Sequence, residues 1–136
     1  MSFTDEEIAY IRSQPLARIA TVSADGQPDV VPVVFEFDGT HFYIGGFAPE
    51  RTRRTRNIDS GNDKVALVID DLASVQPWAP RYLRVYGTAE LVHRGGQNDR
   101  IMKITPIESW SMNLSGRWHP GSGEEASPRK ALHTAS

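Results

Sequence analysis

The sequence has no cysteine among its 136 residues, which excludes disulfide scaffolds, thiolate metal sites and cysteine nucleophiles. It also lacks any apolar run near the roughly 18 residues that a membrane-spanning helix needs. The first residues are acidic and unlike a signal peptide, so we expect a cytoplasmic protein. The net charge is only −2, which gives no reason to expect nucleic acid or a membrane as the partner.

Common catalytic signatures are also missing. The four histidines, at positions 41, 93, 119 and 133, show no metal-ligand spacing, so no metal site is expected. The chain has no Walker loop, no GxGxxG run and no nucleophile elbow. These absences disfavour a hydrolase and a classical dinucleotide-binding fold.

The sequence does contain several short segments rich in β-branched and aromatic residues. They predict strands at 17–22, 30–37, 41–44, 64–70, 81–92 and 100–104. Asp–Gly pairs at 25–26 and 38–39 are hairpin signals that would join the first three strands into an antiparallel meander. Pro32 cannot donate a ladder hydrogen bond, so it marks its strand as an edge or bulged strand.

Helices are expected in only two places. Thr4 and Glu7 have the spacing of a capping box and predict a short first helix that Pro15 ends. A second helical segment is predicted over residues 49–60. Few helices among about six antiparallel strands favour a small β-barrel, which we place in a domain of residues 1–114. Residues 115–136 are polar and predict a mobile tail.

Four arginines at positions 51, 53, 54 and 56 form what we call the arginine cluster. Their guanidinium groups repel one another on a helix, and a bound phosphate would relieve that repulsion through bidentate contacts. Amide donors at the helix start and a close backbone approach at Gly45 and Gly46 would assist. The alternative is a solvated helix whose arginines pair with Glu50 and Asp59, and the residues alone leave both interpretations open.

Two further features could contact a planar ligand. The irregular strand around Pro32 could offer exposed backbone groups to a flat heterocycle, although an ordinary edge strand has the same pattern. Trp78 lies between Pro77 and Pro80, where it could serve as a stacking surface, although core or interface packing is the commoner use of tryptophan.

Several ordered motifs together are similar to the pyridoxamine-phosphate-oxidase-like split β-barrel family. They occupy residues 20–39, 43–46, 52–58 and 62–72. The segment 70–81, followed by 85–90, resembles the deazaflavin-dependent branch, in the subgroup that includes reductases of tetracycline-antibiotic biosynthesis. The chain lacks the C-terminal Arg/His motif of pyridoxamine phosphate oxidases proper, which disfavours vitamin B6 oxidation.

The resemblance implies a mainly β fold, a six-stranded antiparallel split β-barrel (the FMN-binding split barrel) with short peripheral helices. It implies a homodimer with cofactor sites at the interface and coenzyme F420, a deazaflavin, as the cofactor. The residues that would bind it are Val31, Pro32, Val33 and Val34 through their backbone, Gly45 and Gly46 beside the ring, Thr52, Arg53, Arg54 and Asn57 at the phosphate, Arg51 as an extra cation, and Trp78 and Arg81 from the partner subunit.

The implied activity is a reductase that transfers a hydride from the reduced deazaflavin to a conjugated planar substrate. The preferred substrate is a dehydrotetracycline, reduced at a C=C bond. Tyr43, Tyr86 and His41 are available as proton donors, but none stands out and no catalytic side chain is assigned. Two alternatives stay open: an FMN-dependent oxidoreductase of the same fold, and a non-catalytic carrier of F420 or flavin.

Overall fold

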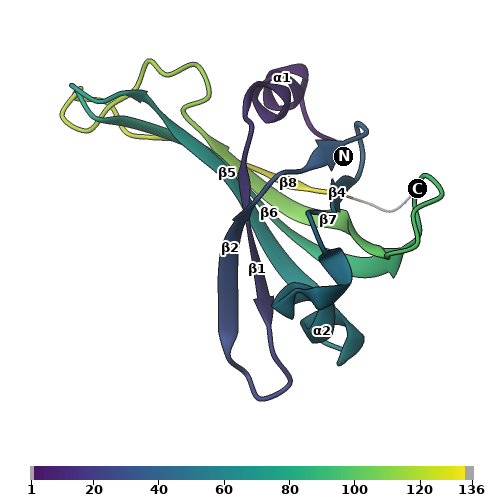
Figure 1. Ribbon diagram of the computed structural model, residues 1–136. Helices are drawn as coiled ribbons and strands as arrows, with labels where there is room; N and C mark the ends of the chain where they lie inside the picture. The colour runs from purple at the N-terminus through teal and green to yellow at the C-terminus, as the bar shows by residue number, and fades with distance from the viewer. Residues whose placement is uncertain (1, 134–136) are drawn as a thin grey trace.

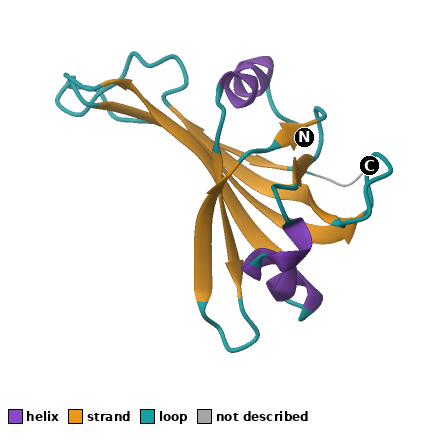
Figure 2. Cartoon of the chain, viewed as in Figure 1, coloured by secondary structure: helices purple, strands orange, loops and turns teal. Residues whose placement is uncertain are grey.

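The structure is a computed structural model that describes residues 2–133. Strands dominate it, as Figure 2 shows, and none of its helices within these residues could span a membrane. In chain order the elements are α1 (Asp5–Ser13), β1 (Ala17–Val22), β2 (Pro28–Val33), β3 (Glu36–Phe37), β4 (Phe42–Ile44), the 3-10 turn η1 (Pro49–Arg51), α2 (Arg53–Asp59), β5 (Lys64–Ser74), β6 (Ala79–Val92), β7 (Ile101–Met112) and β8 (Arg129–Leu132).

The strands form one antiparallel sheet in the order β2-β1-β5-β6-β7-β4-β3, with β8 also paired to β7. The two end strands, β2 and β3, are joined directly by Val34 and Phe35. Because this two-residue link ties the opposite ends together, the sheet must curl on itself (Figure 1). The predicted antiparallel split β-barrel with short peripheral helices is thereby confirmed.

The run 30–37, predicted as one strand of a meander, is divided between the two ends of the sheet. Residues up to Val33 pair with β1, whereas Glu36 and Phe37 pair with β4. The side chain of Val34 turns outward with 69% exposed, and Phe35 packs inward. This division and the additional strand β8 raise the number of strands above the six expected. The edge position predicted from Pro32 is confirmed, because β2 ends the sheet.

The core lies inside the curled sheet and follows the alternation of each strand. Val65, Leu67 and Ile69 of β5 point inward and are buried, whereas the residues between them are half-buried on the outer face. Near the link of Val34 and Phe35 lies a region that we call the closed end of the barrel. Phe42 is fully buried there, and its ring centroid lies 4.7 Å from that of Phe37 and 6.0 Å from that of Phe35. Apolar burial of this kind supplies most of the free energy that holds such a sheet closed.

Glu7 connects the first helix to the end of the chain. The predicted capping box is present, with the Glu7 amide donating to Thr4 Oγ1 at 3.1 Å and the Thr4 amide donating to Glu7 Oε1 at 3.0 Å. The same buried carboxylate accepts hydrogen bonds from Ser111 of β7 and from Arg129 of β8, the latter at 2.8 Å. A buried carboxylate needs such partners, so Glu7 anchors both strands to α1.

The segment 115–136, predicted as a mobile polar tail, includes an ordered strand. In β8, Ala131 is buried and pairs with Ser109 of β7. The sequence pattern did not indicate this strand, because its anchor, Glu7, lies at the other end of the chain. Residues 134–136 of the predicted tail lie outside the described residues. The domain boundary at residue 114 stays a prediction.

Candidate functional site

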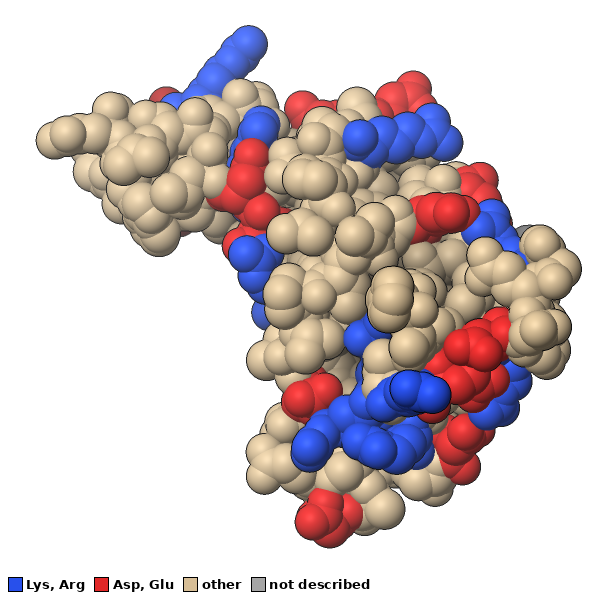
Figure 3. All heavy atoms as spheres, viewed as in Figure 1, with Lys and Arg blue, Asp and Glu red and all other residues tan. Residues whose placement is uncertain are grey.

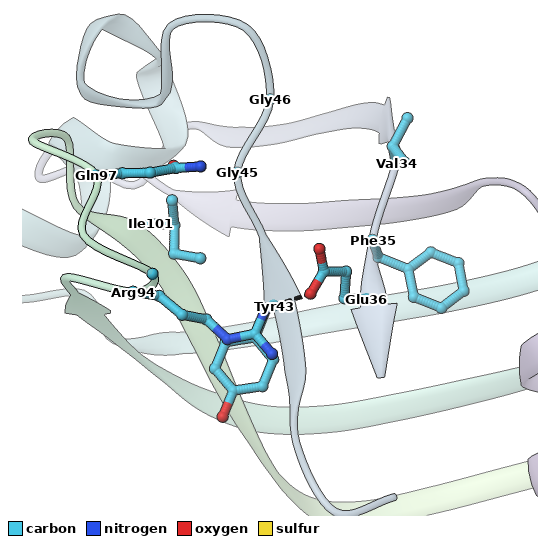
Figure 4. Close-up of a pocket in the computed structure, with 10 residues that line it drawn as sticks. Val34, Phe35, Glu36, Tyr43, Gly45, Gly46, Arg94, Gln97 and Ile101 are labelled. Carbon is cyan, nitrogen blue, oxygen red and sulfur yellow. Dashed lines mark hydrogen bonds and ion pairs between the residues drawn. The ribbon is translucent and has the colours of Figure 1, made fainter. Parts of the chain in front are cut away.

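A cleft of about 630 Å³ opens where the link between β2 and β3 passes the end of β4 (Figure 4). Three of the predicted binding residues line it, namely Val34, Gly45 and Gly46. The sequence placed these residues in separate motifs, and the curl of the sheet brings them to one opening. The other lining residues are Phe35, Glu36, Tyr43, Arg94, Gly95, Gln97 and Ile101.

Gly45 and Gly46 form one wall of this cleft, which we call the glycine wall, and Arg54 of α2 supports it. Its Nη2 donates to the carbonyl oxygen of Gly45 at 3.0 Å. A Cβ atom at Gly46 would lie 3.0 Å from the same nitrogen, and Gly46 has a positive φ of 96°, so a larger residue would be strained there. Burial lowers the pKa of Arg54, whose guanidinium has no carboxylate partner within residues 2–133.

The other members of the arginine cluster, Arg51, Arg53 and Arg56, point to solvent. Figure 3 shows basic atoms gathered over α2. The structure described here contains no ion pair between any of the three and a carboxylate. Asp25 and Asp29 are close enough to act electrostatically on Arg53 and Arg54 but form no ion pair with them. Like charges held together without ion pairs favour anion binding. The cluster therefore has the charge that a phosphate site requires.

Glu50 and Asp59, the two carboxylates that the sequence offered as partners of the cluster, are bound by another arginine. Arg100, just before β7, donates to Glu50 at 2.9 and 3.0 Å and to Asp59 at 2.9 and 3.1 Å. Its hydrogen bonds lower the pKa of Glu50 to about 2 and raise the pKa of Arg100. The pairing of Glu50 and Asp59 with the cluster, one of the two interpretations of the sequence, is therefore absent.

Thr52 and Asn57 make internal contacts that hold α2 in place. The Thr52 hydroxyl caps the helix by accepting from the Thr55 amide, and it donates to the Pro49 carbonyl at 2.8 Å. The Asn57 amide donates to Thr21 Oγ1 of β1 at 2.8 Å and is buried. Neither side chain lines the cleft, so their predicted contact with a phosphate stays a prediction.

The strand β2 leaves one edge free beside the cleft. In the sheet order it pairs with β1 on one side and, among residues 2–133, with no strand on the other. Alternate backbone groups of an edge strand therefore point away from the ladder, where a ligand can meet them. The predicted backbone contact of Val31, Pro32, Val33 and Val34 with a ring is compatible with this edge.

Trp78 and Arg81 lie away from the cleft in the same chain. Trp78 occupies the turn between β5 and β6, whose hairpin projects from the barrel (Figure 1), and 55% of it is exposed. Arg81 donates to Asp71 at 2.7 and 2.9 Å and to the Leu114 carbonyl at 3.2 Å. A single chain thus does not bring either residue to the site, and their predicted approach from a partner subunit stays a prediction.

Comparison with known proteins identifies the family. Residues 3–135 match the family model described as pyridoxamine 5'-phosphate oxidase. The chain belongs to this family. A relative from Streptomyces rimosus, named 5a,11a-dehydrotetracycline/5a,11a-dehydrooxytetracycline reductase, is 39% identical over 123 residues, which cover 82% of this chain and 85% of the relative. The family and this relative together support an oxidoreductase role.

Solved structures share the fold at lower identity. A putative pyridoxamine 5'-phosphate oxidase from Listeria innocua aligns with a TM-score of 0.65 at 17% identity, covering 80% of this chain and 97% of that chain. A protein titled F420 reductase aligns with a TM-score of 0.55 at 22% identity, covering 71% and 90%. These likenesses confirm the split barrel of the pyridoxamine 5'-phosphate oxidase family.

One wall of the cleft was not predicted from the sequence. In this member of the pyridoxamine 5'-phosphate oxidase family, the segment between β6 and β7 forms that wall. Arg94 stacks on the Tyr43 ring at 3.9 Å from its centroid and forms an ion pair with Glu36 of β3. Gly95 and Gly96, both with positive φ, make the turn that sets Arg94 and Gln97 at the opening. The glycine pair after a long strand was the available signal.

Proposed function

We propose that this chain is an F420-dependent reductase. The observation that carries the proposal is the arginine cluster, which forms no ion pair with a carboxylate among residues 2–133 and whose Arg54 contacts the cleft wall at Gly45. A cofactor with a phosphate and further anionic groups suits four neighbouring cations better than a neutral ligand does. When bound, the reduced deazaflavin supplies a hydride for an electron-poor carbon of a conjugated substrate.

Different residues of the site would bind different parts of the cofactor. Arg53 and Arg54, with Thr52 and Asn57, would hold the phosphate, and Arg51 would meet the anionic groups beyond it. The free edge of β2 would meet the ring through its backbone, with Gly45 and Gly46 allowing close approach. The chain's own task is then to position two reactants and to exclude water.

A homodimer is part of the proposal. The outer face of the sheet carries exposed apolar side chains that a second copy would cover, including Val22, Val30, Tyr86, Ile107 and Leu132. A groove of about 330 Å³ runs among several of them. Exposed apolar patches of this kind commonly mark protein interfaces. We also propose that Trp78 and Arg81 of the second copy approach the cleft.

The proposed substrate is a dehydrotetracycline, reduced at a C=C bond, as the name of the Streptomyces rimosus relative states for that protein. The proposed setting is antibiotic biosynthesis in the cytoplasm. Incubation of the purified chain with reduced F420 and a dehydrotetracycline tests this directly. We expect the deazaflavin absorbance to return as the substrate is consumed, and unchanged absorbance would refute the assignment of the substrate.

Parallel titrations with F420 and FMN test the cofactor. Tighter binding of F420 supports the proposal, and tight binding of FMN with a flavin spectrum would favour an FMN-dependent oxidoreductase. Binding of F420 with no turnover of any conjugated acceptor would favour a carrier. Because the arginine cluster serves any phosphate-bearing cofactor, these titrations separate alternatives that the site's charge does not.

A further inference from the structure

Arg100 lies outside the arginine cluster but forms ion pairs with the acidic residues on either side of it. Glu50 lies in η1, immediately before the cluster, and Asp59 is the last residue of α2, three residues after the cluster ends at Arg56. Arg100 bonds to both, so a single guanidinium spans the two ends of the segment that carries the cluster. The backbone amide of Arg100 adds a further hydrogen bond to Glu50 at 2.9 Å.

The geometry leaves few donors of Arg100 unused. The Nε and Nη2 atoms form a two-pronged contact with Glu50, and Nη1 and Nη2 form a second with Asp59. Each carboxylate thereby has both of its oxygens engaged. Contacts of this kind to carboxylates are the strongest that arginine makes, and they hold the acidic side chains in fixed positions.

Without Arg100, the same carboxylates would be free to turn toward the cluster. Glu50 is next in sequence to Arg51, and Asp59 is three residues from Arg56 on the same helix, a spacing at which side chains meet. Each would then place a negative charge where an anionic ligand is to bind. The competition is local, because screening weakens exposed charges over distances of about 8 Å at physiological ionic strength.

We infer that Arg100 is a positioning residue that holds Glu50 and Asp59 away from the arginine cluster and so keeps the cluster available to an anionic ligand. The inference rests on the proposed role of the cluster in binding a phosphate-bearing cofactor. It adds that the affinity of the site depends on a residue that does not line the cleft and that need not touch the ligand.

The test uses Arg100→Met, the triple variant E50Q/D59N/R100M, and the control Arg12→Met, which removes an exposed arginine from α1. Inorganic pyrophosphate is titrated by calorimetry at low salt, so that anion binding is measured without reference to any cofactor. Freeing one carboxylate near the cluster costs about fivefold in affinity, from about 1 kcal/mol for charges 4 Å apart in water. Because Arg100→Met frees two carboxylates, we expect it to bind pyrophosphate about 25-fold more weakly, and the control to match the wild type within about twofold.

Rescue distinguishes this role from simple bracing of α2. The triple variant lacks both the arginine and the carboxylates, so it should bind pyrophosphate within about twofold of the wild type. The double variant E50Q/D59N keeps Arg100 and should bind at least as tightly as the wild type. If Arg100 only braced the fold, both variants would bind as weakly as Arg100→Met. That result, or unchanged affinity in Arg100→Met, would overturn the inference.

F420 is titrated in the same series to separate the two proposals. A wild-type chain that binds pyrophosphate with the expected pattern but does not bind F420 overturns the cofactor assignment and supports the role of Arg100. A wild-type chain that binds no pyrophosphate overturns the role of Arg100. If Arg100→Met does not fold, the double variant carries the test, because weakened binding there contradicts the inference.

Discussion

Replacement of Glu7 by glutamine is expected to destabilise the fold and to loosen the C-terminal strand. Glu7 is only 1% exposed and accepts hydrogen bonds from the Thr4 amide, Ser111 and Arg129. Glutamine keeps the size of the side chain but loses the charge and one acceptor. The substitution therefore tests the anchor itself and leaves the packing around it nearly unchanged.

The magnitude follows from the surroundings of the pair. Removing one partner of a buried ion pair costs about 3–5 kcal/mol. The side chain of Arg129 is 36% exposed, so water replaces part of the lost interaction, and glutamine still accepts one hydrogen bond. We expect a loss of about 2 kcal/mol, which for a chain of this length corresponds to a fall in Tm of about 8 °C.

The effect should depend on pH. Burial alone would raise the pKa of Glu7, but the hydrogen bonds from Ser111 and the Thr4 amide, with the charge of Arg129, hold it below its ordinary value. A carboxyl group with a lowered pKa in the folded state adds stability above its unfolded pKa of about 4.3. That stability is lost as the pH falls through the folded pKa. The difference between the wild type and the variant should thus be complete at pH 7 and shrink below about pH 4.

Urea unfolding followed by circular dichroism measures the change, with Glu6→Gln as the control. Glu6 lies beside Glu7 in the first turn of α1 but is exposed, so its replacement should cost only a few tenths of a kcal/mol. Hydrogen exchange should show faster exchange of the β8 amides in Glu7→Gln alone. Equal unfolding midpoints for the two variants would refute the reasoning.

Three further predictions concern the site and the barrel. Arg54→Ala should weaken F420 binding by about 10- to 100-fold, because a charge-assisted contact is lost, and unchanged affinity by fluorescence titration would contradict the phosphate role. Gly87→Ala should lower the free energy of unfolding by about 2 kcal/mol or more, because its Cβ would lie 2.5 Å from the Thr105 carbonyl oxygen; an unchanged Tm would contradict this. Phe42→Ala should cost about 3–5 kcal/mol in urea unfolding, and a loss below 1 kcal/mol would show that the closed end tolerates a cavity.

Local sequence patterns predicted most of the helices and strands, but not which strands form the two edges of the sheet. The Asp–Gly turns, the capping box at Thr4 and the helical segment 49–60 are all read from neighbouring residues, and each is present. The run 30–37 has the composition of one strand. Its division between β2 and β3 depends on which strands flank it, and that is set by pairing with β1 and β4, not by its own residues.

The strand β8 and the role of Arg100 escaped prediction for a related reason. The tail before β8 is rich in glycine, serine and proline, which is typical of mobile segments. The strand β8 is anchored by Glu7, which lies more than a hundred residues earlier in the chain. Arg100 is likewise far in sequence from Glu50 and Asp59. Sequence spacing shows that Glu50 and Asp59 could meet the arginine cluster. It does not show that the remote Arg100 forms ion pairs with both of them.

The candidate site was predicted in part because much of its binding surface is local. Gly45, Gly46 and Arg54 lie within ten residues and meet in the structure. The amide of Asn57 donates to Thr21, so its expected contact with a phosphate stays a prediction. Residue type and spacing indicate which side chains could bind an anion. They do not show which of these are used to hold the helix.

The two-residue link at Val34 and Phe35 has a consequence for how such a protein can change. The free edge of β2, the wall formed by Gly45 and Gly46, and the arginine cluster lie in one continuous stretch of chain, residues 31–57, although β2 and β3 within it occupy opposite borders of the sheet. The opposite wall, with Arg94 and Gln97, is encoded separately. Exchange of the single segment 31–57 between relatives could therefore alter the ligand held at this border while the turn that faces it is retained, so that the two halves of the cleft can diverge independently.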